Sequence, residues 1–247
     1  MIPILGVTEG RPVKRMHSGP AASRHANEAP DRSRFTRGAV RGPDVMKNVR
    51  HTMPVETRLL AIAADELRRH GPRHITVVGI ADAAGMTHAN VYRYFANKAA
   101  LVDAVAGQWL RRMEATIADI ADSPDPADDK LERLIQAWAR IHRDLLKDDR
   151  NLFDVYCSAT ETSRPLIRKH RSRMRVLIDR VLDEGIATAK FDPRDREKAH
   201  AFVTDSVYRF INPLTVRLDA DVPQDILDQR LATMIRVVLR ALANGSV

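Results

Sequence analysis

The sequence has almost no cysteine and few aromatic residues. Its single cysteine, Cys157, excludes an internal disulfide and a zinc site built from cysteines. A chain without disulfides is typical of a reducing compartment, so we expect the cytoplasm. Aromatic residues make up 5% of the chain, against 44% hydrophobic residues in all. This balance favours a helical protein with a core of Ala, Leu, Ile and Val.

Long apolar runs and the common catalytic motifs are also missing. No run of about 18 apolar residues is present, so we expect neither a transmembrane helix nor a membrane partner. The N-terminus lacks the apolar core of a secretory signal. We find no phosphate-binding glycine-rich loop, HExxH motif or GxSxG motif. His70 and His74 have metal-ligand spacing, but Gly71 and Pro72 break the helix between them. We therefore expect no catalytic residue, cofactor or metal.

The charge is unevenly distributed along the chain. Residues 1–50 hold ten lysines and arginines against four acidic residues, which accounts for most of the net charge of +8. This segment has no apolar periodicity, so we expect it to be a disordered basic extension. It could strengthen non-specific DNA contact as a basic arm. A solvated extension, or a translation start at Met46 or Met53 instead of Met1, is the interpretation we favour.

From Pro54 onward the sequence has the periodicity of amphipathic helices and none of the alternation of strands. We predict about nine helices, three in a small head and six in a larger body. Asp125 with Pro126, and Asp192 with Pro193, each resemble a helix cap followed by a first-turn proline. Pro213 should kink the helix that contains it. Outside the central motif the predicted helices are Val55–His70, Asn97–Ala121, Pro126–Lys147, Asn151–Ala159, Pro165–Ala189, Pro193–Leu218 and one that begins at Pro223.

The segment 76–95 has the pattern of a DNA-binding helix-turn-helix. The apolar face of its first helix consists of Val77, Ile80, Ala81 and Ala84. Gly85 follows at the position where that helix must stop and turn. Thr87 can cap a second helix, and Val91 and Phe95 would anchor that helix on the core. His88, Ala89, Asn90, Tyr92, Arg93 and Tyr94 then remain on its outer side. A short helix with this surface is suited to a major groove, where Asn90 and Arg93 can read base edges.

These residues and their flanks resemble the tetracycline-repressor (TetR) family of bacterial transcriptional regulators. The most specific part is the run from Asn90 to Leu101, with Tyr92, Phe95 and Lys98. His88 and Ala89 stand where lysine and glycine are frequent, and Ala96 stands where proline is frequent, which leaves the operator sequence open. The predicted DNA-binding residues are Thr76, Thr87, His88, Ala89, Asn90, Tyr92, Arg93, Tyr94 and Lys98.

The resemblance implies two regions and three partners. Residues 54–114 would form the helix-turn-helix DNA-binding domain, and residues 115–247 a domain for ligand binding and dimerisation. The partners would be a pseudo-palindromic double-stranded operator, a small effector of unknown identity and a second copy of the chain. The protein would be a repressor that its effector releases. Six residues are candidates for the effector cavity, although ordinary core packing also explains them: Trp109, Met113, Trp138, Phe153, Tyr156 and Tyr208.

The last helix is a candidate dimer interface. Leu231, Ile235 and Val238 share one face, and Leu227, Met234 and Leu242 widen the apolar surface beyond a single stripe. Apolar surface of this width is normally covered by a partner. The resemblance implies that the last two helices of each subunit form a four-helix interface.

Two alternatives come from other functional classes. An all-helical enzyme would need clustered ligands or acid–base residues, and the sequence shows no such cluster. A helical adaptor would leave Tyr92, Arg93, Tyr94 and Lys98 without a role. A basic cluster from Arg164 to Arg180 could bind an anion or a phosphate backbone. We favour a solvated helix face, because the apolar residues of that helix already give it an inner side.

Overall fold

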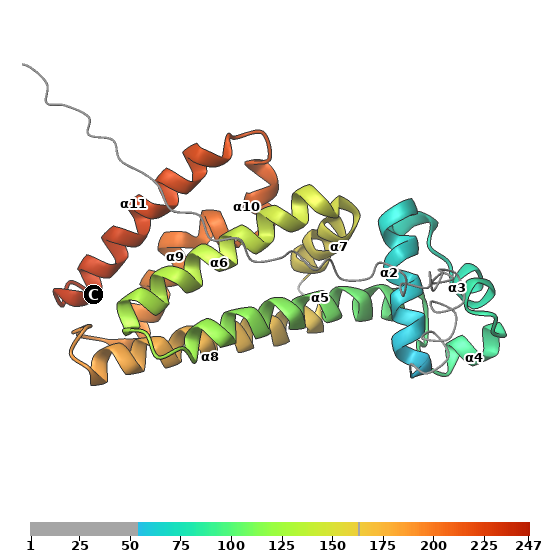
Figure 1. Cartoon of the computed structure of the whole chain (residues 1–247), viewed down its shortest axis with the longest axis horizontal. Coiled ribbons are helices and arrows are strands. Elements are labelled where there is room, and N and C mark those ends of the chain that lie inside the picture. The colour runs from blue at the N-terminus through green and yellow to red at the C-terminus, as the bar shows by residue number, and fades with distance from the viewer. Residues whose placement is uncertain (1–53, 163) are drawn as a thin grey trace, which may run out of the picture. The chain divides into compact units, whose positions relative to one another are not determined.

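A computed structural model describes residues 54–162 and 164–247 of the chain, and these residues form helices and no strands (Figure 1). The all-α prediction is therefore confirmed. The helices are α2 (Val55–His74), α3 (Val77–Ala84), α4 (His88–Tyr92), α5 (Lys98–Ala121), α6 (Ala127–Asp148), α7 (Arg150–Glu161), α8 (Pro165–Ala187), α9 (Arg196–Ile211), α10 (Pro213–Leu218) and α11 (Gln224–Ala243). Within these ranges no helix is long and apolar enough to cross a membrane. The predictions for residues 1–50 and for the translation start lie outside the described residues.

Pro213 ends one helix and begins another. The described residues contain ten helices, one more than predicted, because α9 stops at Ile211 and α10 starts at Pro213. Proline has no N–H for the helical ladder. The side-chain oxygen of Asn212 accepts a hydrogen bond from the Leu214 N–H at 2.9 Å and caps the new helix. The predicted kink is thus a full break.

Two of the predicted helix caps are wrong. Asp125 does not cap α6, which begins at Ala127 without a side-chain cap. Its carboxylate instead forms an ion pair with Arg133. Asp192 does not cap α9 either, because that helix begins at Arg196. The cap is Asp195, whose Oδ1 accepts from the Glu197 N–H at 2.9 Å.

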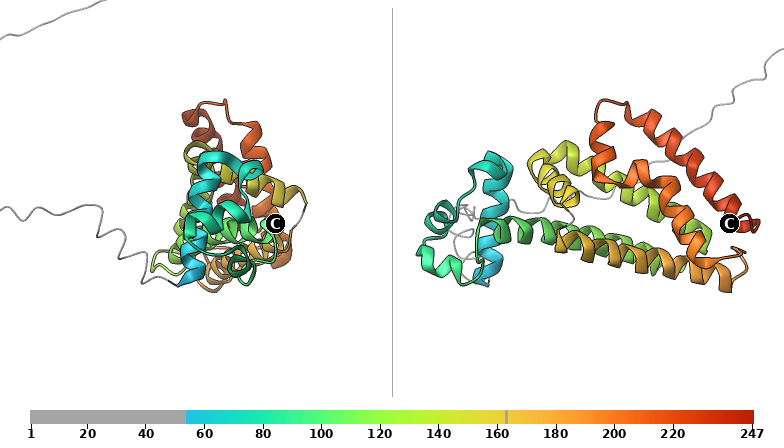
Figure 2. Two further views of the ribbon diagram at one scale, coloured as in Figure 1. Left: turned by 90° about the vertical axis from the view of Figure 1, so that its right-hand side faces the viewer. Right: turned by 180° about the vertical axis from the view of Figure 1, so that it is seen from behind.

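The helix α5 belongs to both apolar cores. Asn97 caps its start by accepting a hydrogen bond from the Ala100 N–H at 2.8 Å. Its first turns pack Leu101 and Val105 with α2, α3 and α4, which we call the head. Its later turns pack Met113 and Ile117 with α6, α8, α9 and α11, which we call the body. In Figures 1 and 2, α5 lies alongside α8. Because α5 contributes side chains to both cores, this one helix links the head to the body.

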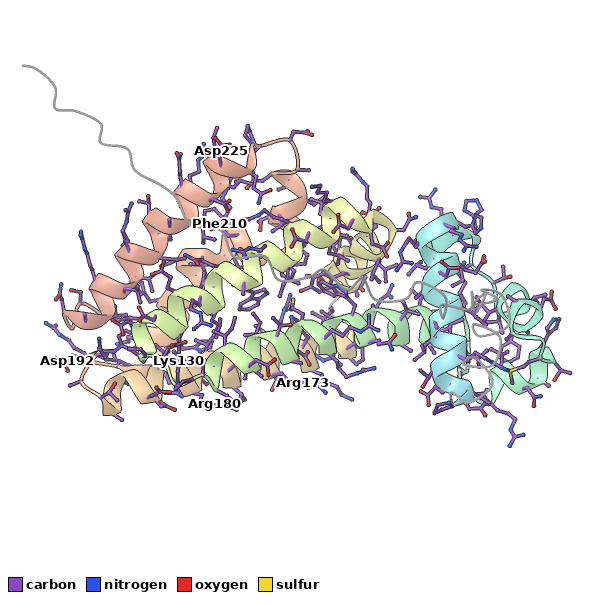
Figure 3. The ribbon with its side chains drawn as sticks, in the orientation of Figure 1. Lys130, Arg173, Arg180, Asp192, Phe210 and Asp225 are labelled. Carbon is purple, nitrogen blue, oxygen red and sulfur yellow. The ribbon has the colours of Figure 1, made fainter. Side chains whose placement is uncertain are left out.

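The body helices are also joined by ion pairs. The buried Lys130 on α6 contacts Glu184 on α8 at 2.7 Å, and its position is labelled in Figure 3. Arg180 on α8 pairs with Asp122 at the end of α5. Removing Glu184 would leave the buried Lys130 ammonium unpaired, and such losses cost about 3–5 kcal/mol. These contacts hold α8 against α5 and α6.

Candidate nucleic-acid interface and effector cavity

The turn between α3 and α4 is built as predicted. The Thr76 hydroxyl caps α3 by accepting from the Gly79 N–H at 3.0 Å. Val77, Ile80 and Ala81 are buried beneath it. Gly85 has φ of 64°, in the left-handed region that ends helices, and the next residue closes the turn on the Ala81 carbonyl at 2.9 Å. The helix-turn-helix geometry is therefore present.

The short helix α4 presents its outer side to solvent. Val91 is fully buried and Phe95 is 4% exposed, so these two residues anchor the segment on the head core. The residues between and before them are exposed: His88, Ala89, Asn90, Tyr92, Arg93 and Tyr94. Thr87 is exposed but makes no side-chain cap, and only its backbone carbonyl accepts from the Asn90 N–H at 3.0 Å. The predicted capping role of Thr87 is wrong, and its hydroxyl remains free for other contacts.

Three predicted DNA-binding residues already have partners in the protein. Lys98 is partly buried, and its Nζ donates to the Arg73 carbonyl at 3.0 Å. The Thr76 hydroxyl is held by its own helix start. The Nε2 atom of His88 lies 3.7 Å from Asp82 Oδ1 on α3. The sequence pattern did not predict Asp82 as a partner of His88, because an exposed acidic residue on a helix normally contacts water.

The head is bonded to α7, a helix that contributes residues to both cores. Helix α2 is broken at Gly71, whose φ is 76°, and the Nε atom of Arg68, just before this break, lies 3.3 Å from Asp149 Oδ2. The Asn151 amide donates to the Arg68 carbonyl at 2.9 Å. Asp149 also caps α7 by accepting from the Leu152 N–H at 3.0 Å. A movement of α7 would therefore pull on the end of α2.

A cavity of about 480 Å³ opens between α6, α7, α8 and α9. Three of the six predicted effector residues line it: Trp138, Tyr156 and Tyr208. Trp109 lies behind this wall, with its ring centroid 5.5 Å from that of Tyr156, and Met113 is buried in the same core. The prediction for Phe153 is wrong, because this fully buried ring packs in the head core. Periodicity identifies a buried face but not the core that it joins.

Buried polar groups surround the cavity wall, and the sequence prediction missed them. His142 on α6 is fully buried among the rings of Trp109, Trp138 and Tyr156. Neither of its nitrogens has a well-formed hydrogen bond, and the Trp138 indole N–H also has no partner. Burial, together with the nearby His170, lowers the pKa of His142 to about 3, while the Ile211 carbonyl partly offsets the shift. A histidine four residues after Trp138 on the apolar line was the available signal.

A buried ion pair ends at the same wall. His170 Nδ1 lies 2.8 Å from Glu114 Oε1, and Arg173 contacts the other oxygen of that carboxylate at 2.9 Å (Figure 3 labels Arg173). Burial raises the pKa of Glu114, but the hydrogen bonds and charges of His170 and Arg173 outweigh this and lower it. Because an ionised carboxylate only accepts, Nδ1 of His170 must carry a proton. Nε2 of His170 has no partner.

A second cavity, of about 400 Å³, lies between α6, α9, α10 and α11. Two of its charged residues are already matched, since Arg209 and Arg143 pair with Asp219 and Asp228 at 2.5 and 2.6 Å. The aromatic cavity is the better effector candidate, because its wall has more buried polar atoms without partners.

The structure corrects the predicted dimer residues. Leu231, Ile235 and Val238 are at most 2% exposed within a single subunit, because this face of α11 packs on the body core. They are not available to a partner. The opposite side of α11 carries other apolar side chains, with Val237 51% and Ile226 37% exposed.

Comparisons with known proteins agree with this geometry. Residues 59–105 match the profile described as bacterial regulatory proteins, tetR family. Residues 127–234 match the tetracyclin repressor-like C-terminal domain. The chain is 29% identical over 158 residues to the HTH-type transcriptional repressor KstR2 of Mycobacterium tuberculosis, covering 64% of this chain and 76% of that one.

Solved structures share the fold. A TetR/AcrR-family regulator from Thermobifida fusca YX-ER1 is 20% identical, with a TM-score of 0.55, over 77% of this chain and 97% of that chain. A protein of unknown function from Rhodococcus sp. RHA1 is 19% identical, with a TM-score of 0.62, over 78% and 98% of the two chains. The two matched profiles describe regulators, which excludes the enzyme and adaptor alternatives. The chain therefore belongs to the TetR family of bacterial transcriptional regulators, whose members bind DNA and respond to small ligands.

Proposed function

We propose that this protein is a transcriptional repressor that acts as a homodimer and leaves its operator when a small molecule fills the aromatic cavity. The exposed outer side of α4, anchored by Val91 and Phe95, is the observation that carries the proposal. Repression is inferred from the similarity to KstR2, which is named a repressor. Because its partner is chromosomal DNA, we propose that the protein acts in the cytoplasm.

We propose the region 54–114 as the DNA-binding domain and the region 115–247 as the effector and dimerisation domain. Two α4 helices related by a two-fold axis would enter successive major grooves about 34–36 Å apart. In each subunit, Asn90 on α4 and Arg93 at its C-cap are proposed to read bases. Tyr92 and Tyr94, together with the Thr87 hydroxyl, are proposed to contact the backbone of the duplex.

Release would follow two structural connections. The helix α7 lines the cavity with Tyr156 and Thr160, and its other end bonds Arg68 through Asp149 and Asn151. The helix α5 contributes to both cores. A ligand that binds better to one position of α7 and α5 shifts the population of the heads toward that position. When the distance between the two α4 helices no longer matches the spacing of successive major grooves, the dimer dissociates from the operator.

The test begins with genomic DNA fragments retained by the purified protein. We expect one enriched, inverted-repeat motif and an affinity that falls steeply as salt rises. Binding to the motif should exceed binding to scrambled duplex by about 10³-fold or more. Equal affinity for motif and scrambled DNA at every salt concentration would refute sequence-specific regulation.

A further inference from the structure

We propose that the ligand of the aromatic cavity is an apolar organic acid, with its hydrocarbon body among the rings and its carboxylate bound by Arg171. This inference rests on the proposed function only in naming the ligand an effector. The chemistry of the cavity itself carries the ligand class.

The cavity wall requires an apolar body. Four helices contribute apolar side chains to it, and the volume of about 480 Å³ lies within the range of small-molecule sites. Burial of hydrocarbon against such a wall is favourable by roughly 25 cal/mol per Å². The main apolar lining residues are Trp138, Tyr156, Ile167, Met174, Ile178 and Ile211.

Several donors in the wall lack acceptors. The Trp138 indole N–H is buried without a partner. The Tyr208 oxygen accepts from Asn212 Nδ2 at 2.8 Å, so its own proton remains available. Burial raises the pKa of Tyr156, which keeps that hydroxyl protonated and able to donate. The Tyr208 side chain is half-exposed, whereas the Trp138 indole is buried, and a buried donor without a partner is costly. Ligand oxygens would satisfy them.

The charges at the cavity point to an anion. Arg175 forms ion pairs with Asp179 and Glu197. The Nδ1 atom of His200 lies 2.7 Å from Oδ1 of the same Asp179. Within the described residues Arg171 makes no ion pair. Its guanidinium group offers a planar fork that matches a carboxylate.

Asp205 also lines the cavity and must be considered against an anionic ligand. Arg171 comes from α8 and Asp205 from α9, so the two charges reach the cavity from different helices. The carboxylate is placed near Arg171 and away from Asp205.

The two tryptophans of the chain make the test direct. Trp138 lines the cavity, and the ring centroid of Trp109 lies 5.5 Å from that of Tyr156, so tryptophan fluorescence reports on occupancy. The probes are decanoate and decyltrimethylammonium, each below its micelle concentration, and decanol below its solubility limit in water. We expect saturable binding of decanoate and binding of decanol that is weaker by about tenfold, the loss of roughly one charge-assisted hydrogen bond.

Three variants assign the charge preference. Arg171→Gln should weaken decanoate binding by about tenfold and leave decanol binding unchanged. Asp205→Asn should leave decanoate binding equal or tighter. Lys169→Gln is the matched control, because this exposed cation lies on α8 but does not line the cavity. Circular dichroism must show unchanged helix content in all three.

The outcomes separate the ligand class from the proposed function. No probe binding, equal binding of decanol and decanoate, or no effect of Arg171→Gln would overturn the organic-acid proposal. Preference for decyltrimethylammonium, lost in Asp205→Asn, would identify a cation site instead. If decanoate binds through Arg171 yet leaves operator affinity unchanged, the ligand class stands and the effector role fails.

Discussion

Asp149 contacts the guanidinium of Arg68 at 3.3 Å while its other oxygen caps α7. One carboxylate thus joins the first turn of a cavity-lining helix to the last regular turn of α2 in the head. The Asn151 amide adds a hydrogen bond to the Arg68 carbonyl at 2.9 Å. The head is thereby bonded to the element that a ligand would displace, so its position depends on that of α7.

Asn151→Ala should loosen this joint without unfolding the protein. It removes one hydrogen bond to a backbone carbonyl, which contributes about 1 kcal/mol to the free energy of unfolding. Amide hydrogen exchange should accelerate at residues 68–74 and remain unchanged in α11. The exposed Asn244→Ala is the control. Unchanged exchange at residues 68–74 would show that the Asn151 bond does not hold α2.

Acid should destabilise the fold through His142. Its pKa is lowered from 6.5 to about 3 in the folded protein, so the unfolded chain binds the proton first as pH falls. The free energy of unfolding should therefore be highest above about pH 6.5 and fall toward pH 3. The loss from this group is at most about 1.4 kcal/mol per pH unit. The lowered pKa of Glu114 acts in the same direction.

The measurement is the free energy of unfolding in urea between pH 7 and pH 5, at one protein concentration. His142→Phe should give a shallower pH dependence than the unchanged protein. His88→Phe, at an exposed histidine, is the matched control and should keep the original dependence. An identical slope in His142→Phe and the unchanged protein would show that His142 does not titrate on unfolding in this range.

The sequence predicted the head better than the body, for a physical reason. Val91 and Phe95 were correctly assigned as anchors, because in a short helix the phase alone decides which side is buried. Phe153 and Ile235 were misassigned, because a periodic pattern does not say whether the buried side meets one core, another core or a partner chain. That choice is made by tertiary packing, which no local pattern contains.

The predicted caps show the same limit. Asp125 and Asp192 both precede a proline, which predicted a cap at each. Instead, Asp125 forms an ion pair with Arg133, and the residue that caps α9 is Asp195. Long-range partners compete with a local cap for the same carboxylate. His142 was missed because its position on an apolar helix line predicts that it is buried, but not that its nitrogens lack hydrogen-bond partners.

Base reading should depend on Asn90 and Arg93. Asn90 is exposed on α4 and Arg93 is exposed at its C-cap, and each carries groups that can make a bidentate contact to a base edge. Loss of one such contact should cost about 1–3 kcal/mol in operator binding and relax selection at one base pair. The measurement is the binding motif that Asn90→Ala and Arg93→Ala each select from random duplexes. Gln229→Ala on α11 is the control and should select the motif of the unchanged protein. An unchanged motif in both variants would mean that sequence is read elsewhere or through DNA shape.

Dimerisation should depend on the exposed side of α11 and not on its buried side. Ile235 is 1% exposed within the subunit, so Ile235→Glu would place a charge in the core and unfold the chain. Val237 is 51% exposed on the same helix, so Val237→Glu should preserve helix content and melting behaviour of the subunit. If Val237 lies at the two-fold contact, the variant should become monomeric in light scattering and bind the operator weakly, because one half-site alone gives little affinity.

Thr233→Glu, also exposed on α11, maps the extent of the contact. A folded, dimeric Val237→Glu would place the interface on another face of the body.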